Sequence, residues 1–158
     1  YNGRQWYTVE ESGGLQMFMG EYHHNIDEKG RIVIPTKFRE ILQDKFIVVR
    51  GIEKCLYIYA KKDWDKLVEK LNTLPFTKKD ARTFIRSFFS GATECEFDRQ
   101  GRTCIASPLI VYAGLSKECV IIGANDRIEI WGLTEWNEFL AQNEEKLSDI
   151  AENLFGDV

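Results

Sequence analysis

The chain has 158 residues, a formal net charge of −4 and a hydrophobic content of 44%, enough for one compact domain or two small ones that share a core. No apolar run approaches the roughly 18 residues that a membrane span needs, and no secretory leader is recognisable, so we expect a soluble protein without a membrane partner. The charge is uneven, because residues 17–134 carry +3 and residues 135–158 carry −6. A mildly basic body with an acidic end keeps a polyanionic partner open.

The first sixteen residues match nothing in the rest of the chain. We interpret 1–16 as a leader, either introduced for expression or a native arm. The residues that follow predict two strand pairs separated by a short helix. The strands are expected at 21–26, 31–34, 46–49 and 55–59, and the helix over 35–42. Pro35 suits the first turn of that helix, because its missing N–H has no partner there.

A helical segment follows these strands. Asp63 to Leu74 places its apolar residues on one face, and Pro75 ends it. Thr77-Lys-Lys-Asp resembles a capping box, which predicts a second helix to about Phe89.

The second half of the chain repeats the order of the first. Strands are expected at 91–97, 102–106, 118–122 and 127–131. Ser107 and Pro108 are the predicted N-cap and first residue of another short helix, with Gly114 as its C-cap. Thr134 is the predicted cap of one long final helix with a single apolar stripe.

The two halves also match residue by residue. Residues 27–31, Asp-Glu-Lys-Gly-Arg, return 71 positions later as Asp-Arg-Gln-Gly-Arg at 98–102. At an offset of 72, Gly51 pairs with Gly123 and Trp64 with Trp136. We conclude that the chain holds two copies of one unit.

This duplication predicts how the chain is organised. The expected segments are the leader 1–16, a first unit 17–66, a helical insert 67–90, a second unit 91–137 and an acidic helix 138–158. Neither unit has enough strands to bury both faces of its sheet, so we expect an α+β fold in which both close one small barrel about a pseudo-twofold axis.

Catalytic chemistry has little support. His23 and His24 are neighbours in a predicted strand and point to opposite faces, so they are poor joint metal ligands. No motif for a catalytic nucleophile, a zinc site, a phosphate loop or a dinucleotide is present. The four cysteines lack a C-x-x-C pair and are interpreted as reduced core thiols. We therefore expect no enzyme activity, no metal, no cofactor and no small-molecule substrate.

The doubled turn allows a structural and a functional interpretation. Its aspartate can accept backbone N–H bonds and pair with its arginine, which alone would explain a tight turn. The second copy, however, carries two arginines on a short tip, and a planar guanidinium matches a guanine edge or a phosphate. Lys29, Lys37, Arg39 and Arg99 are candidates to neutralise phosphates.

The runs Met-Phe-Met-Gly at 17–20, 27–35 and Gly-Ala-Thr-Glu-Cys at 91–95, together with the second turn, resemble the MraZ family. That family belongs to the AbrB-like, swapped-hairpin superfamily, and the similarity spans Met17 to about Phe155. The resemblance implies a swapped-hairpin, double-psi-like β-barrel and a cytoplasmic, nucleoid-associated regulator of the bacterial division and cell-wall gene cluster. It also implies binding to double-stranded DNA as a ring-like homo-oligomer. One departure is Ala106, where the first unit has Pro35.

We therefore expect sequence-specific DNA binding through the two turns. The arginines that end the turns are expected to contact bases or phosphates, the aspartates to hold those arginines, the glycines to let the backbone bend, and the tip cations to add phosphate contacts. The predicted DNA-binding residues are Asp27, Lys29, Gly30, Arg31, Asp98, Arg99, Gly101 and Arg102. The alternatives are a protein-binding scaffold or antitoxin-like module without DNA binding, and a barrel enzyme whose site the motifs miss.

Overall fold

The computed structural model describes residues 17–156 and shows an α+β fold built on antiparallel strands. The predicted leader, 1–16, lies outside the described residues. The first half contains β1 (Phe18–Asn25), β2 (Arg31–Val33), α2 (Thr36–Leu42), β3 (Lys45–Arg50), β4 (Leu56–Ala60), α3 (Lys61–Leu71) and α4 (Lys79–Ser90). The second half contains β5 (Thr93–Glu96), β6 (Arg102–Cys104), α5 (Ser107–Ala113), β7 (Glu118–Asn125), β8 (Ile128–Gly132), α6 (Leu133–Asn143), the 3₁₀ turn η1 (Glu144–Lys146) and α7 (Leu147–Phe155).

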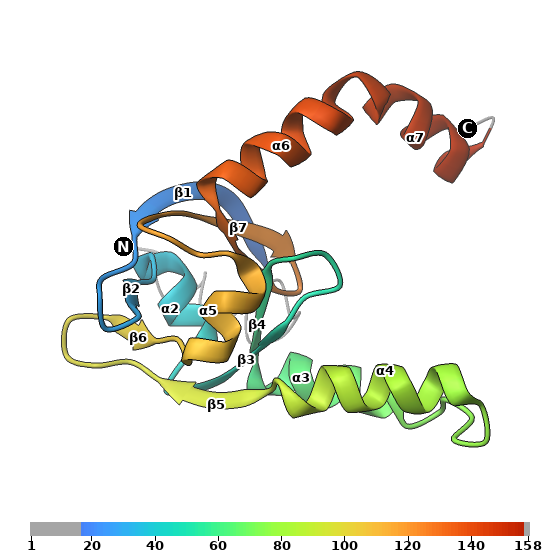
Figure 1. Ribbon diagram of the computed structural model, residues 1–158, viewed down its shortest axis with the longest axis horizontal. Helices are drawn as coiled ribbons and strands as arrows, with labels where there is room; N and C mark the ends of the chain where they lie inside the picture. The colour runs from blue at the N-terminus through green and yellow to red at the C-terminus, as the bar shows by residue number, and fades with distance from the viewer. Residues whose placement is uncertain (1–16, 157–158) are drawn as a thin grey trace, which may run out of the picture.

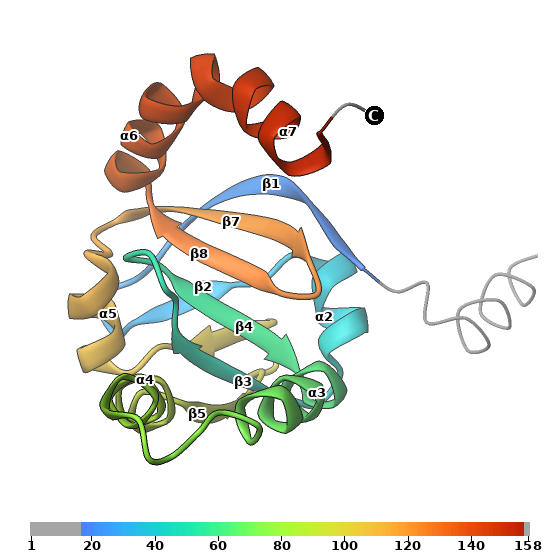
Figure 2. The same ribbon diagram turned by 90° about the vertical axis from the view of Figure 1, so that its right-hand side faces the viewer.

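The two halves exchange strands. The larger sheet has the order β1-β7-β8-β4-β3-β5, and the strands of Figure 2 follow this order down the molecule. β1 therefore pairs with β7 of the second half, and its counterpart β5 pairs with β3 of the first. A separate two-stranded ribbon joins β2 to β6. Each half thus contributes one outer strand to the sheet beside strands of the other half.

The strand register is symmetric about a pseudo-twofold axis. In the β2–β6 ribbon the central pair is Ile32 with Thr103, which are equivalent positions of the two halves. In the large sheet Tyr57 faces Glu129, which are again equivalent. The axis passes through both pairs, so the turns that precede β2 and β6 are related by it.

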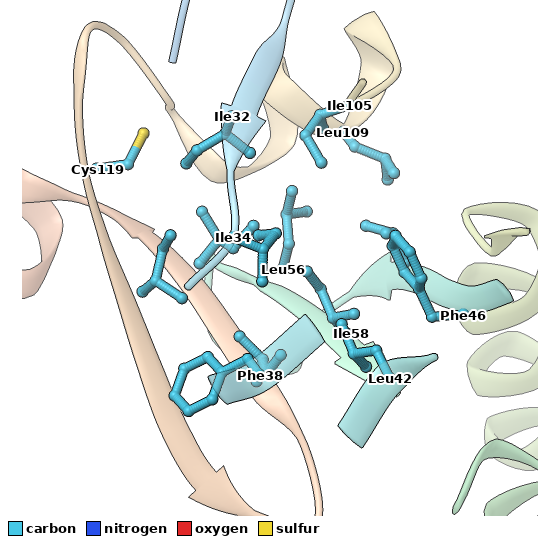
Figure 3. Close-up of a cluster of buried hydrophobic side chains, with 14 of the residues drawn as sticks. Ile32, Ile34, Phe38, Leu42, Phe46, Leu56, Ile58, Ile105, Leu109 and Cys119 are labelled. Atoms are coloured by element: carbon cyan, nitrogen blue, oxygen red, sulfur yellow. The ribbon is translucent and has the colours of Figure 1, made fainter. Parts of the chain in front are cut away.

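The core lies between the ribbon and the large sheet, where α2 and α5 close its sides (Figure 3). The alternation of each strand brings one residue in two inward, so Ile32 of the ribbon and Ile58 of β4 are fully buried. Phe18 and Tyr22 of β1 pack edge-on against Phe38 of α2. One face of the ribbon therefore packs on the core, and its other face points outward.

A second apolar cluster covers the opposite face of the large sheet. Trp64 of α3 stacks on Phe88 of α4 with 5.7 Å between ring centroids, so α3 and α4 form a closed hairpin over β4. In the second half Trp136 stacks on Phe139 within α6, while α7 continues away from the body (Figure 1).

Three expectations at element ends are wrong. The capping box does not form, because α4 begins at Lys79 with Lys78 as its N-cap and no side-chain cap bond. Ala106, rather than Ser107, is the N-cap of α5, although Gly114 is the left-handed C-cap as expected. The α6 helix begins after Gly132 without a Thr134 cap.

The single long final helix is also wrong, because η1 separates α6 from α7. The side-chain amide of Asn143 donates to the Phe139 carbonyl at 2.8 Å, and the Asn143 backbone, with φ −117° and ψ −17°, departs from α-helical geometry where η1 begins. Among residues 17–156 no helix is both long and apolar enough to cross a membrane.

Candidate functional site

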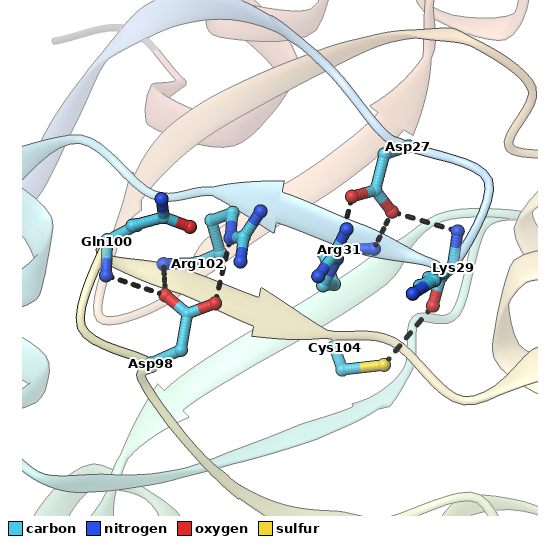
Figure 4. A network of polar contacts seen from close by, with 7 residues as sticks. All are labelled: Asp27, Lys29, Arg31, Asp98, Gln100, Arg102 and Cys104. Atoms are coloured by element: carbon cyan, nitrogen blue, oxygen red, sulfur yellow. Dashed lines mark hydrogen bonds and ion pairs between the residues drawn. The ribbon is translucent and has the colours of Figure 1, made fainter.

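The first turn is organised by the carboxylate of Asp27. Its Oδ1 accepts the backbone N–H of Lys29 at 2.9 Å and of Arg31 at 2.8 Å. Its Oδ2 accepts Nε of Arg31 at 2.7 Å (Figure 4). One side chain therefore closes the turn and fixes the direction of the arginine that ends it.

The second turn repeats this arrangement closely. Asp98 Oδ1 accepts the backbone N–H of Gln100 and of Arg102, both at 2.9 Å. Asp98 Oδ2 accepts Nε of Arg102 at 2.8 Å. The structural interpretation of the aspartates is thus satisfied in both turns, and each aspartate also orients a guanidinium.

The glycines of the turns are required by the backbone. Gly30 has φ +80° and Gly101 has φ +75°, a region that residues with a Cβ adopt only at a cost. Each also links the halves, because Gly30 accepts from the Ile105 N–H at 2.7 Å and Gly101 accepts from the Ile34 N–H at 3.2 Å.

Both arginines lie on the outward face of the β2–β6 ribbon. Arg31 faces Cys104 in the register and Arg102 faces Val33, while Ile32 and Thr103 between them point into the core. The Cα atoms of such diagonal neighbours on one face of an antiparallel pair are about 7–8 Å apart. The side chains keep 33% (Arg31) and 26% (Arg102) exposure, so neither guanidinium is enclosed by protein.

The aspartates are held in their charged form. The backbone N–H of Arg31 is the largest cause that lowers the pKa of Asp27, and the Arg31 guanidinium and the Lys29 N–H add to it. The pKa of Asp98 is lowered in the same way, first by the Arg102 N–H. Each ion pair uses Nε, and within residues 17–156 no hydrogen bond engages the terminal nitrogens of either guanidinium.

The two turns carry different residues at the tip and have different residues packed beneath the glycine. The tip residues are Glu28-Lys29 in the first turn and Arg99-Gln100 in the second. Ile110 of α5 lies against Gly30, whereas its counterpart Arg39 of α2 lies against Gly101. The helix of each half thus supports the turn of the other.

Arg39 is the site residue whose position sequence reasoning missed. The sequence predicts it only as a general phosphate contact, yet it donates to the Ile34 carbonyl at 2.7 Å and to Thr36 Oγ1 at 2.9 Å. It lines a depression of about 610 Å³ beside the second turn, together with Arg99 and the acids Glu40 and Asp44. The offset of 71 makes Arg39 equivalent to Ile110, but only the exchanged fold brings both under a turn.

The remaining candidates are structural or solvent-exposed. His23 Nε2 donates to the Glu21 carboxylate at 2.8 Å on the exposed face of β1. Residues 17–156 contain no group of three or more His, Cys, Asp or Glu side chains arranged to hold a metal ion. All four cysteines are free thiols, but the expectation that all lie in the core is wrong, because β6 turns Thr103 inward and leaves Cys104 exposed on the ribbon.

A protein-family model described as "MraZ protein, putative antitoxin-like" matches residues 17–87 and, a second time, residues 88–158. The chain belongs to the MraZ family. The two consecutive matches confirm the tandem repeat, and each contains one of the aspartate-closed turns. The first match ends within α4, and the second begins at the next residue.

Proposed function

We propose that this protein is a sequence-specific DNA-binding transcriptional regulator without catalytic activity. It acts in the cytoplasm, associated with the nucleoid, on the bacterial division and cell-wall gene cluster. It binds repeated upstream elements as a ring-like homo-oligomer, and the two D-x-x-G-R turns make the contacts. Membership of the MraZ family supports a regulator at the level of the family.

The observation that carries the proposal is the shared outward face of Arg31 and Arg102. Two arginines at diagonal positions of one antiparallel ribbon, with Cα atoms about 7–8 Å apart, present four terminal nitrogens on the same face. B-DNA's major groove is about 12 Å wide and admits a two-stranded ribbon. The turns at both ends of the ribbon then lie near the phosphates that border the groove.

The aspartate bonds favour recognition because they order the arginines before DNA arrives. An arginine side chain carries about 2 kcal/mol of rotamer entropy, part of which binding would otherwise cost. Each Nε is bonded to its aspartate, so the two terminal nitrogens remain for a bidentate contact with guanine O6 and N7. Lys29 and Arg99 at the tips add phosphate contacts, and Gly30 and Gly101 keep the tips narrow.

One subunit offers a short ribbon, so useful affinity requires several. Linked copies on repeated elements raise affinity through effective concentration without new contacts. We propose that the exchanged strand pairing is a swapped-hairpin, double-psi-like β-barrel formed by 17–66 and 91–137, with 67–90 and 138–158 as helical extensions. The barrel faces the DNA, and the extensions lie at the opposite end of the molecule (Figure 1).

The test is a gel-shift series with the region upstream of the protein's own gene cluster. Arg31→Ala and Arg102→Ala should each weaken binding about 5- to 150-fold, which corresponds to 1–3 kcal/mol for a base contact. Met19→Ala, which changes an exposed residue of β1 outside the ribbon and outside both helical extensions, is the control and should bind like wild type. Wild-type affinity should fall steeply with added salt. Wild-type strength in both arginine variants would remove the ribbon from the interface.

A second candidate is a protein-binding, antitoxin-like module without DNA binding, which the family description itself favours. The same turns would then face a polypeptide. A stoichiometric protein that co-purifies with wild type but not with Arg102→Ala, combined with no DNA shift at low salt, would select this candidate.

A further inference from the structure

The helix α7 is an apolar surface without a partner in the part of the chain that the structure describes. Leu147, Ile150 and Leu154 follow one face at helical spacing, and Leu147 and Leu154 are 66% and 76% exposed. Phe155 beside them is 67% exposed, and no residue of α7 is buried.

A helix of this kind is not stable by itself. It has nine residues, whereas isolated helices below about 12–15 residues are marginal in water, and most helical stability comes from packing of an apolar face. Covering each leucine would contribute about 1.5–3 kcal/mol of burial. The face of α7 therefore needs a surface that its own subunit does not supply.

The first half of the chain shows how the second is incomplete. There α4 folds back on α3 and Phe88 stacks on Trp64, whereas α7 leaves α6 and extends into solvent (Figure 1). The related α3–α4 hairpin also keeps apolar surface open beside it. A groove of about 570 Å³ lies between α4 and the β3–β4 loop, lined by Arg50, Ile52, Phe84, Phe88 and Tyr112. Ile52 at its rim is 73% exposed.

The net charges of the two helical segments indicate which surface α7 contacts. Residues 133–156 hold six acids against Lys146, a net charge of −5, while residues 61–90 hold eight cations against four acids, a net charge of +4. Contact of two α6–α7 arms with each other would bring two acidic surfaces together. Contact of an α6–α7 arm with an α3–α4 hairpin pairs opposite charges.

We propose that α7 of one copy of this chain docks into the groove between α4 and the β3–β4 loop of a second copy. The apolar stripe of α7 fills the groove, and its acidic flanks, Asp149 and Glu152, face the cations of the hairpin. The contact joins two different surfaces, so it propagates from copy to copy and closes into a ring where the rotation allows it. This assignment of surfaces rests on the self-association in the proposed function and says which residues make it.

The test uses variants that block one surface each. The double variant Leu147→Asp/Leu154→Asp removes the stripe, and Ile52→Glu and Phe84→Glu, made separately, obstruct the groove. Met19→Asp changes another exposed apolar residue, 67% exposed on β1, and is the matched control. Mass is measured by sedimentation velocity on the full chain, with circular dichroism and thermal unfolding to show that each variant folds.

We expect wild type and the Met19 variant to be oligomers, and the stripe and groove variants to be monomers of 18.4 kDa. A mixture of a stripe variant and a groove variant should form dimers only, because each pair retains one intact α7 and one intact groove. Added salt should shift wild type toward smaller species.

Three results would overturn the assignment. Groove variants that keep the wild-type mass while the stripe variant dissociates would show that α7 contacts something else. Folded stripe and groove variants that all stay oligomeric would leave self-association standing and remove these surfaces. A monomeric wild type would refute self-association as well, whereas DNA binding is read separately from the gel shift.

Discussion

The two turn glycines have nearly the same φ but different surroundings, which predicts unequal effects of alanine. A Cβ at Gly30 would stand 2.8 Å from the backbone oxygen of Ile105, and this backbone cannot move without breaking the Ile105 N–H bond to Gly30. A Cβ at Gly101 would instead meet the guanidinium of Arg39, the far end of a flexible side chain. Both substitutions also carry the cost of the left-handed conformation.

The expected costs follow from these contacts. The left-handed region costs an L-residue about 1–2 kcal/mol, and a lost backbone hydrogen bond adds about 1 kcal/mol. Gly30→Ala should therefore destabilise by about 2–3 kcal/mol, which lowers Tm by about 4–12 °C at the 2–4 °C per kcal/mol of a chain this long. Gly101→Ala should cost about 1 kcal/mol less than Gly30→Ala, because Arg39 can swing toward solvent.

Urea unfolding at fixed protein concentration, followed by tryptophan fluorescence, measures both costs. Arg39→Ala supplies the internal control, since it removes the obstacle at Gly101 and leaves Gly30 untouched. In that background Gly101→Ala should become less costly and Gly30→Ala should not change. Equal costs of Gly101→Ala with and without Arg39, within the roughly 0.5 kcal/mol of independent sites, would refute the reasoning.

Three further outcomes test the site. Folding lowers the pKa of Asp27 and Asp98 below its ordinary value, first through the backbone N–H of the arginine that ends each turn. Their contribution to stability is therefore complete above the ordinary pKa and is lost as pH falls through the lower folded pKa. The Tm gap between wild type and Asp27→Asn/Asp98→Asn should shrink below about pH 4, and a constant gap would contradict this. Cys104 is exposed opposite Arg31, so bound DNA should slow its alkylation by iodoacetamide; unchanged rates would place the DNA elsewhere. Arg99→Gln should make the slope of log affinity for DNA against log salt less steep by about 0.9 for each phosphate that is no longer neutralised. Glu28→Gln should raise the affinity for DNA. Similar effects of the two substitutions would contradict the charge difference between the turns.

Much of the fold was visible in the chain because its signals are local. The turn pattern, the flanking β-branched runs and Gly114 each act within a few residues, and the elements appear within a few positions of their predicted bounds. The tandem repeat was visible for the same reason, since Asp27 and Asp98 sit in matching local patterns. The aspartate bonds within each turn follow directly from that pattern.

The expectations that failed depend on partners distant in the sequence or on backbone changes that the residue pattern does not specify. The register of Phe18 with Asn125 joins residues from the two halves of the chain and has no local signal. The apolar stripe of the last segment predicted one continuous helix, but the backbone of Asn143, with φ −117°, departs from helical geometry and the 3₁₀ turn η1 separates α6 from α7. Cys104 looked apolar by residue type, yet the register of β6 with β2 decides which face it occupies.

Fusion of the two units into one chain frees the turns to diverge. In a dimer of identical units any change in one tip appears in both, whereas here the backbone geometry is kept while Glu28 corresponds to Arg99 and Ile110 to Arg39. The residue that packs beneath each turn comes from the other half, so the two turns differ beneath the tip as well as at the tip. In the proposed complex such a subunit would make two similar contacts of unequal charge and would therefore have a direction on DNA that a symmetric dimer lacks.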